Sequence, residues 1–192
     1  MNKLTRKDLM SLEQYSEKRA SVRAEVIAHK QNRHIALGEH VRLLFEDRLT
    51  IQYQIQEMLR VERIFEAAGI QDELDSYNPL IPDGDNLKAT LLIEYEDVDD
   101  RKLALEKLRG IEDVIYAKID AEKIYAVADE DIERENETKT SSVHFLRFQF
   151  EKNQIARLRG GAVLLFGIDH PHYAIDIALT PAQRAALLAD LS

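Results

Sequence analysis

The chain has 192 residues, of which 45% are hydrophobic and 32% are charged, a balance typical of a globular protein and unlike that of a disordered chain. Its 35 acidic and 26 basic side chains give a formal net charge of -9, which opposes non-specific binding to nucleic acid or to anionic membranes. The sequence contains no cysteine, which excludes disulfides, cysteine-ligated metal centres and cysteine nucleophiles from this chain.

The first residues carry no targeting signal. They are charged and amphipathic, without an apolar signal core, and nowhere do about 18 apolar residues follow one another. We therefore expect a cytoplasmic protein with no membrane partner and no nucleic-acid partner. Because no long stretch rich in Pro, Gly or Ser interrupts the chain, we expect a single domain over 1–192.

The first part of the sequence is predicted to be mostly helical. Thr5 followed by Asp8 resembles a capping box and predicts a helix over about 6–19. A second helical stretch is predicted over 22–30, and Gly38 is expected to end it or the loop that follows it. Residues 40–45 are apolar and β-branched, which favours a short strand.

The longest predicted helix runs from about 50 to 68. Apolar residues recur there near a period of 3.6, and Gly69 is expected to supply the left-handed C-cap. The sequence NPLIPDG at 78–84 is typical of a rigid connector, because proline presets a turn dihedral and glycine accepts positive φ. We expect the chain to change from helix to sheet at this connector.

Strands and short helices alternate after the connector. Thr180, Pro181 and Gln183 form a strong start signal for a final helix. Residues 129–140 are predicted to be a solvated charge run. The other predictions are strands over 87–95, 114–119, 123–128, 142–150, 163–168 and 173–179, and helices over 99–109 and 152–159.

The predicted strand over 142–150 alternates between apolar and polar residues. Val143, Phe145 and Phe148 are expected to make the apolar contacts, with a slip of register near Leu146. Together the elements predict an α+β fold: a helical N-terminal part, about 1–77, packed on a mostly antiparallel sheet, about 87–192, with a C-terminal helix.

One polar face of the longest predicted helix is a candidate binding site. Gln52, Gln56, Arg60 and Arg63 recur at spacings of three or four residues, so their amide and guanidinium groups share one face. Such a face can hold a carboxylate or a phosphate, and Arg147 is a candidate to join it. The alternative is a solvated face on which the arginines pair with neighbouring glutamates.

A second candidate site contains histidine. The turn Asp169-His170-Pro171-His172 brings two imidazoles and a carboxylate together, and His144 lies on a predicted strand that can pair nearby. Two histidines, an aspartate and a further ligand suit iron or zinc. The alternative is that these are ordinary turn residues, because the segment lacks an established metal-binding spacing such as HExxH.

Several stretches resemble a bacterial family of unknown function. They are LFEDR at 44–48, YQIQEMLR at 53–60, NPLIPDG at 78–84, KTSSVHFLRF at 139–148 and DHP at 169–171, and the resemblance covers nearly the whole chain. Its members are often encoded beside a rubrerythrin and an iron–sulfur oxidoreductase. The resemblance therefore implies these redox proteins as partners and a role near peroxide defence or electron transfer.

Three hypotheses follow from the sequence. The first is an accessory or binding protein that recognises an anionic ligand or a partner protein through the Gln/Arg face. The second is a metal-dependent redox component or enzyme that uses iron or zinc at the histidine site. The third is a structural homo-oligomer in which the basic N-terminal segment meets an acidic surface of another copy.

Overall fold

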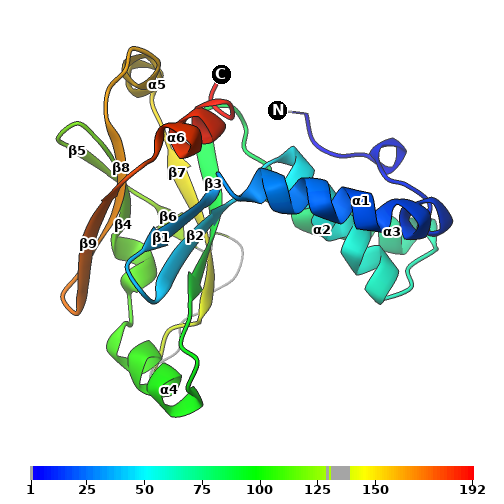
Figure 1. Ribbon diagram of the computed structural model, residues 1–192, viewed down its shortest axis with the longest axis horizontal. Coiled ribbons are helices and arrows are strands. Elements are labelled where there is room, and N and C mark those ends of the chain that lie inside the picture. The colour runs from blue at the N-terminus through cyan, green and yellow to red at the C-terminus, as the bar shows by residue number, and fades with distance from the viewer. Residues whose placement is uncertain (1, 129, 131–138) are drawn as a thin grey trace.

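The computed structural model has an α+β fold with two parts (Figure 1). It describes residues 2–128, 130 and 139–192. A helical part projects from a sheet-rich part, and in the described residues every strand pairing is antiparallel, which confirms the predicted fold class. None of the described helices is long and apolar enough to cross a membrane. Most of the predicted charge run at 129–140 lies outside the described residues.

The N-terminal segment forms a short 3-10 helix, η1 (Arg6–Asp8), followed by one long helix, α1 (Leu12–Lys30). The predicted break between two helices at 19–22 is wrong. Ser11 caps α1 in a capping box. Its hydroxyl accepts a hydrogen bond from the Gln14 amide, and its own amide donates to the Gln14 side chain. The Thr5–Asp8 box exists as predicted, but it caps only the 3-10 turn.

The longest predicted helix, about 50–68, ends earlier than predicted, since α2 spans Arg48–Val61. A further helix, α3 (Ala67–Tyr77), follows, and most of it was not predicted. The chain leaves α2 through Arg63, whose φ of 55° lies in the left-handed region. The Ile64 amide then donates to the Leu59 carbonyl at 3.0 Å, which is the bond that closes a Schellman motif. The prediction that Gly69 caps the helix is therefore wrong, since Gly69 lies inside α3. The connector begins as a 3-10 turn, η2 (Asn78–Leu80).

The helical part has a small apolar core of its own, and one charged group links its two main helices. The buried residues of this core are Leu4, Ile51, Ile55, Leu59, Leu74 and Ile81. Glu57 on α2 accepts the Tyr15 hydroxyl at 2.6 Å and the Arg19 guanidinium at 2.8 and 2.9 Å. Arg60 adds a contact at 3.2 Å. The hydrogen bonds from Arg19, with those from Tyr15 and Arg60, lower the pKa of Glu57 to about 2, although partial burial opposes its ionisation.

We expect the substitution Glu57→Gln to lower the free energy of unfolding by about 1–3 kcal/mol at neutral pH, because the buried Tyr15 hydroxyl and Arg19 lose their anionic acceptor. A lowered pKa gives stability above the unfolded-state value of 4.5, and that stability is lost as pH falls toward about 2. The difference between variant and parent should therefore shrink over that range. Urea denaturation at several pH values measures it, with the exposed Glu17→Gln as control. A constant difference at all pH values would contradict this role.

Sheet A has the strand order β1-β2-β3-β7-β6. Its strands are β1 (His34–Leu37), β2 (Val41–Phe45), β3 (Asn86–Ile93), β7 (Val143–Gln149) and β6 (Val127–Ala128). The sequence prediction missed β1, which forms a hairpin with β2 around Gly38, whose φ is 79°. The sheet-rich part therefore also takes in residues 34–45. Gly38 serves this hairpin turn and does not end a helix, and an added Cβ there would meet the Tyr173 hydroxyl at 2.6 Å.

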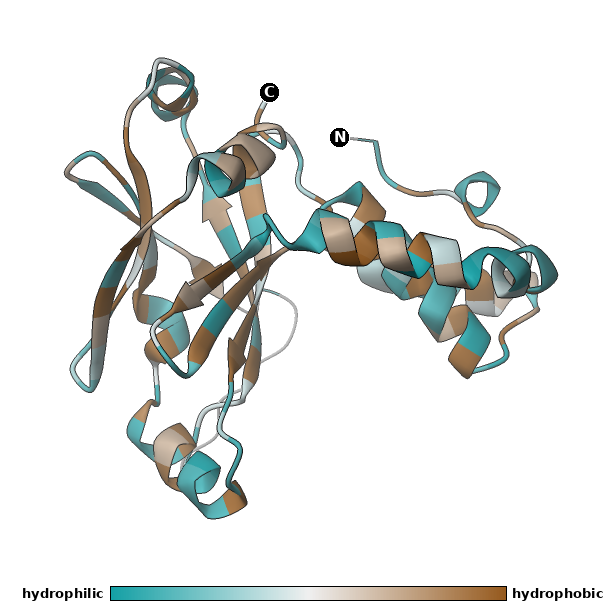
Figure 2. Cartoon of the chain, in the orientation of Figure 1, coloured by the Kyte–Doolittle hydropathy of each residue, from teal (hydrophilic) through white to brown (hydrophobic). Residues whose placement is uncertain are grey.

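Sheet B has the order β5-β4-β8-β9. Its strands are β4 (Ile115–Ile119), β5 (Glu122–Tyr125), β8 (Leu164–His170) and β9 (Tyr173–Ala178). Both sheets contribute to one large apolar core, which contains Phe45, Phe148 and Phe166. Apolar and polar residues are mixed along the strands (Figure 2). Burial alternates along β3 and β7, so that one face of these strands meets the core. The remaining elements are α4 (Val98–Lys107), the 3-10 turn η3 (Ile111–Val114), α5 (Lys152–Arg159) and α6 (Pro181–Leu188).

Strand β7 buries Phe148, as predicted, but the predicted core contacts of Val143 and Phe145 are wrong. His144, Leu146 and Phe148 are buried, whereas Val143, Phe145 and Arg147 alternate with them on the outer face of sheet A. The strand contains no slip of register: pairing with β3 is continuous from Asn86–Gln149 to Leu92–Val143. The prediction failed because an aromatic residue stands on each face, so hydrophobicity alone does not show which face is buried.

A buried arginine joins the helical part, sheet A and the C-terminal segment. Arg33 donates to the carbonyls of Phe45 at 3.1 Å, Glu46 at 3.2 Å and Ala186 at 3.2 Å, and it forms a close ion pair with Asp190. It also lies 3.4 Å from the carboxylate of Asp47, which caps α2. We call this group the Arg33 joint.

Candidate functional site

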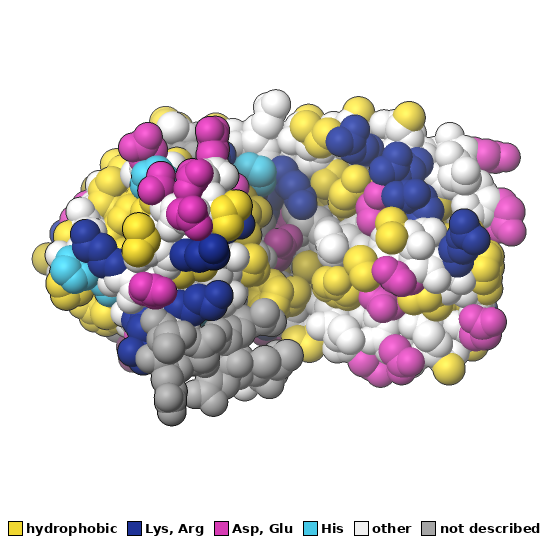
Figure 3. All heavy atoms as spheres, turned by 90° about the horizontal axis from the view of Figure 1, so that it is seen from below, with side chains coloured by type: hydrophobic (Ala, Val, Ile, Leu, Met, Phe, Trp, Pro, Cys, Tyr) yellow, Lys and Arg dark blue, Asp and Glu magenta, His cyan; other side chains and the backbone are white. Residues whose placement is uncertain are grey.

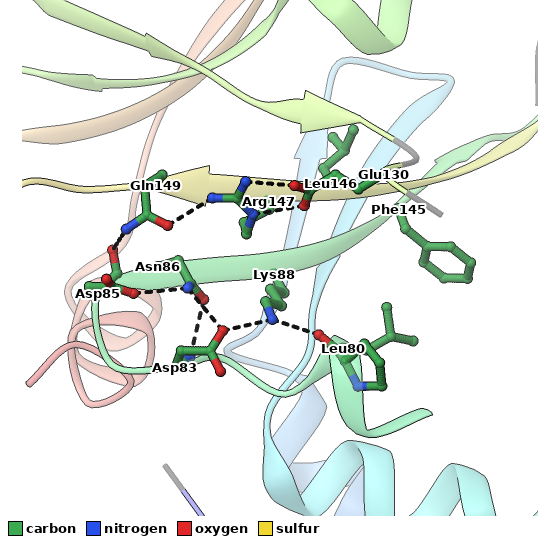
Figure 4. Close-up of a pocket in the computed structure, with 11 residues that line it drawn as sticks. Leu80, Asp83, Asp85, Asn86, Lys88, Glu130, Phe145, Leu146, Arg147 and Gln149 are labelled. Atoms are coloured by element: carbon green, nitrogen blue, oxygen red, sulfur yellow. Dashed lines mark hydrogen bonds and ion pairs between the residues drawn. The ribbon is translucent and has the colours of Figure 1, made fainter. Parts of the chain in front are cut away.

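A cleft of about 490 Å³ opens on the outer face of sheet A, beside the connector that leads out of the helical part. The space-filling view from below shows the surface hollowed between the two parts (Figure 3). The volume falls within the range of small-molecule sites, about 300–1,000 Å³. The cleft is lined by polar side chains of β3 and β7 and by apolar groups that include Leu80 and Phe145 (Figure 4). We call it the Lys88–Arg147 cleft.

Two cations face each other across the strands in this cleft. Lys88 on β3 and Arg147 on β7 are direct cross-strand partners in the antiparallel register. Like charges in this arrangement destabilise a sheet unless other groups compensate them. The alternation of side chains along each strand places both residues on the outer face, with exposed side-chain fractions of 13% and 25%.

The guanidinium of Arg147 holds a carboxylate in fork geometry. Its Nε and Nη2 each donate to one oxygen of Glu130 at 2.7 Å, and its Nη1 donates to the Gln149 side chain at 2.7 Å (Figure 4). Two parallel hydrogen bonds of this kind are the geometry by which arginine recognises planar carboxylates. The hydrogen bonds to Glu130 raise the pKa of Arg147 and lower that of Glu130.

The ammonium group of Lys88 contacts the connector at the edge of the cleft. It donates to the Pro79 carbonyl at 2.6 Å and to Asp83 at 2.9 Å. Asp83 also accepts from Lys3 at 2.7 Å, so the N-terminal segment contributes a third cation. Partial burial opposes the ionisation of Asp83, but hydrogen bonds from Lys3, Lys88 and Asn86 hold the pKa of its carboxyl well below its usual range.

These charges suit binding better than acid–base chemistry. Lys3, Lys88 and Arg147 are balanced by Asp83, Glu130 and Asp85, the last of which accepts from Asn86 at 2.9 Å. The lowered pKa values of Asp83 and Glu130 make both weak bases at neutral pH. A ligand carboxylate that replaced Glu130 on the Arg147 fork would give the guanidinium a partner of the same charge and geometry.

The two glutamines of the predicted Gln/Arg face lie elsewhere and bind the N-terminal segment. The Gln52 side chain donates to the Asp8 carbonyl at 2.5 Å. Gln56 is buried and accepts the Met10 amide at 2.6 Å. Their polar groups therefore satisfy the backbone of residues 8–10 and fix this segment against α2.

The two arginines of the same predicted face stand at the far end of α2. Arg60 pairs with Glu57 at 3.2 Å, as the alternative of a glutamate-paired face foresaw. Arg63 is exposed and occupies the left-handed position that ends the helix. Arg147 belongs to the cleft on sheet A. The structure thus divides the five candidate binding residues among three places.

The four candidate metal ligands are not brought together. His170 is buried, with its Nε2 3.1 Å from the Arg109 carbonyl and its Nδ1 3.3 Å from the His172 amide, so both ring nitrogens are used. Asp169 points to the opposite face of β8, where it accepts from Lys123 at 2.6 Å and from Tyr125 at 2.6 Å. Among the described residues, no three His, Asp or Glu side chains are arranged to hold a metal ion. The iron or zinc site stays a prediction.

His144 belongs to a buried polar cluster of its own. Its Nε2 lies 3.0 Å from the Ser141 carbonyl and 2.9 Å from the Thr140 hydroxyl, and the hydroxyl donates to Glu112 at 3.0 Å. A carbonyl can only accept, so Nε2 must carry a hydrogen. His144, Thr140 and Glu112 are each at most 5% exposed, so the cluster fixes the segment that enters β7 from inside the protein.

Sequence reasoning missed Lys88, although both strands of the cleft were predicted. The pairing of the two predicted strands could have found it. If the strands over 87–95 and 142–150 pair in antiparallel order, Lys88 lies close to Arg147. The position of Glu130 and the approach of the connector depend on tertiary packing.

Comparisons with known proteins agree with the fold and add no activity. The model of a family described as a protein of unknown function, DUF3501, matches residues 3–191. A crystal structure of a novel protein of unknown function from Burkholderia pseudomallei K96243, at 1.90 Å resolution, is 52% identical to the chain. The alignment covers 100% of each chain, with a TM-score of 0.94. A search of curated proteins finds no match.

Proposed function

Because the chain belongs to the DUF3501 family, whose description gives no activity, we propose its function from the cleft itself: it is a binding protein for a small organic carboxylate. The carboxylate would occupy the Arg147 fork, and an apolar portion of the ligand would lie against Leu80 and Phe145. The observation that carries the proposal is the cross-strand pair of Lys88 and Arg147 on an open sheet face.

Glu130 supports the choice of a carboxylate. Its side chain already occupies the fork with two contacts of 2.7 Å, so the guanidinium has the geometry that a carboxylate ligand needs. An ion pair that is partly exposed contributes only about 0–1 kcal/mol, so a ligand with further contacts can displace it. Side chains of Asn86 and Gln149 supply additional polar groups around the fork.

Isothermal titration calorimetry with phenylacetate, acetate and inorganic phosphate tests the proposal. We expect phenylacetate to bind most tightly, since it combines a carboxylate with an apolar ring. Arg147→Gln should weaken its binding by roughly 10- to 100-fold, because a hydrogen bond to a charged group contributes about 1.5–3 kcal/mol. Glu130→Gln should tighten binding several-fold, since it removes the competing carboxylate from the fork.

The matched control is Arg157→Gln. Arg157 also forms a double ion pair, with Asp120 and Glu122, but it lies on α5 and does not line the cleft. Equal affinities in the Arg147 and Arg157 variants would overturn the proposal, and so would weaker binding after Glu130→Gln. Preference for inorganic phosphate over both carboxylates would reassign the ligand to a phosphate compound.

The redox setting implied by the family resemblance stays part of this proposal. On that reading the ligand, or a partner such as rubrerythrin or an iron–sulfur oxidoreductase, belongs to a peroxide-defence or electron-transfer system. Its support is the sequence resemblance alone. Co-elution of the purified proteins in size-exclusion chromatography tests it, and separate elution of the three at low ionic strength would count against direct partnership.

A further inference from the structure

Asp85 is the one acidic side chain lining the Lys88–Arg147 cleft that pairs with no cation among the described residues. The other two carboxylates of the lining are paired, Asp83 with Lys88 at 2.9 Å and Glu130 with Arg147 at 2.7 Å. In the described part of the chain the carboxylate of Asp85 accepts one hydrogen bond, from a neighbouring side-chain amide. Because a carboxylate has about four acceptor positions, Asp85 offers open acceptors to a ligand in the cleft.

The surrounding hydrogen bonds hold Asp85 in place just before β3. Its backbone carbonyl accepts the Phe150 amide at 2.9 Å and the Gln149 side chain at 3.1 Å. Its carboxylate accepts the side-chain amide of Asn86, a residue that is only 3% exposed, at 2.9 Å. Gln149 also accepts from Arg147 at 2.7 Å, so it connects the backbone of Asp85 to the guanidinium. A group that is already fixed loses little conformational freedom when a ligand binds.

Asp85 lies apart from the Arg147 fork but within its electrostatic reach. The two side chains form no ion pair within the described residues. The pKa of Arg147 is nevertheless raised, chiefly by the hydrogen bonds to Glu130 and in addition by the charge of Asp85. Figure 4 shows Asp85 and Phe145 on opposite sides of Arg147. A ligand held on the fork therefore has a carboxylate to one side and an apolar group to the other.

The charges of the cleft favour a ligand without net charge. The three cations are Lys3, Lys88 and Arg147, and the three carboxylates are Asp83, Asp85 and Glu130. A ligand that takes the fork displaces the Glu130 side chain without removing its charge, so a simple carboxylate would leave one negative charge in excess. A ligand that also carries an ammonium group keeps the sum at zero and gives Asp85 a cation.

We infer that the cleft binds an apolar α-amino acid, with its carboxylate on Arg147, its ammonium group on Asp85 and its side chain against Phe145. This inference rests on the proposed carboxylate site and narrows its ligand to a zwitterion. The three groups on an α-carbon point in different directions, which matches the separate positions of the fork, Asp85 and the apolar lining (Figure 4). An ammonium group has three donors and no acceptor, so it suits a carboxylate with open acceptor positions.

Isothermal titration calorimetry at neutral pH with three ligands that share one ring tests the inference. L-Phenylalanine carries both charged groups, 3-phenylpropanoate lacks the amino group, and phenethylamine lacks the carboxylate. We expect L-phenylalanine to bind at least about tenfold more tightly than either analogue, because each analogue lacks one charged contact. Asp85→Asn should weaken L-phenylalanine about tenfold. The same variant should tighten 3-phenylpropanoate, since it removes a negative charge, and this opposite sign shows that the variant is folded.

Asp75→Asn is the matched control and should change neither affinity. Asp75 also accepts a side-chain amide, from Gln71 at 2.7 Å, but it lies on α3 and does not line the cleft. If 3-phenylpropanoate binds as tightly as L-phenylalanine and Arg147→Gln weakens both, this inference is wrong while the carboxylate site stands. Equal binding of phenethylamine, or no binding of any of the three, would refute both. Weaker binding of L-phenylalanine after Glu130→Gln would assign the ammonium group to Glu130 and refute the role of Asp85.

Discussion

Replacing Arg33 by methionine is expected to lower the free energy of unfolding by about 3–5 kcal/mol at neutral pH, because the buried carboxylate of Asp190 loses its cation and Asp47 keeps, of its ion-pair partners, only His29, whose Nε2 lies at 2.5 Å. The Arg33 side chain is 2% exposed and pairs with Asp190 and Asp47. Urea denaturation followed by circular dichroism measures the loss. The exposed Arg23→Met on α1 is the matched control and should change stability by less than about 0.5 kcal/mol.

The loss should depend on pH in a defined direction. Burial raises the pKa of Asp190 to about 6 even though Arg33 opposes the shift. An acid with a raised pKa stabilises the fold most below its unfolded value of 3.8, and that stabilisation is lost as pH rises through about 6. Without Arg33 the pKa of Asp190 rises further, so the penalty of the variant should be greater at pH 8 than at pH 5.

Asp190→Asn provides the second arm of this experiment. When Asp190→Asn is combined with Arg33→Met, the carboxylate that lost its cation is removed as well. The double variant should therefore regain part of the lost stability, since residues of one buried network do not act additively. A penalty that is the same at pH 5 and pH 8, or a double variant less stable than Arg33→Met alone, would contradict the assignment of the joint.

We expect Phe166→Ala to cost about 3–5 kcal/mol of unfolding free energy, through lost burial and the cavity it leaves. Phe166 is fully buried on sheet B, and its ring centroid lies 4.9 Å from that of Phe45 and 5.1 Å from that of Phe148, both on sheet A. The three rings therefore join the inner faces of the two sheets.

Differential scanning calorimetry and urea denaturation both measure this effect. Phe166→Leu keeps most of the volume and should cost less than about 1.5 kcal/mol. Phe65→Ala removes an equally large but exposed ring and is the matched control, with a change within about 0.5 kcal/mol. A loss below 1 kcal/mol for Phe166→Ala would mean that the two sheets do not depend on this contact.

Local signals account for much of what the sequence predicted correctly. The helix over 152–159 has the predicted bounds, and Thr180 caps the final helix with the predicted Gln183 contact, because capping depends on residues three apart. Apolar and β-branched segments bounded by turn residues predicted most strands of both sheets. The α+β class also follows from local periodicity, since each period is a property of consecutive residues.

Local signals failed where the sequence allowed two helix ends or two buried strand faces of nearly equal merit. The end of α2 at Arg63 was missed because a non-glycine residue rarely takes the left-handed conformation, so Gly69 looked like the better cap. Val143 and Phe145 were wrongly placed in the core together with Phe148, because Phe145 and Phe148 stand on opposite faces of β7 and only its continuous pairing with β3 excludes a slip of register between them. The division of the strands into two sheets is likewise a long-range property.

The candidate site was decided almost wholly by tertiary structure. The sequence by itself determined that Arg147 lies on a strand, that a proline-rich connector precedes the strand that became β3, and that no cysteine chemistry is available. Only the strand register placed Lys88 opposite Arg147, and only the packing of the N-terminal segment turned Gln52 and Gln56 from a ligand face into backbone anchors. A side chain's chemistry is fixed by its residue type, but its partners are fixed by which distant segments the fold brings within hydrogen-bond distance.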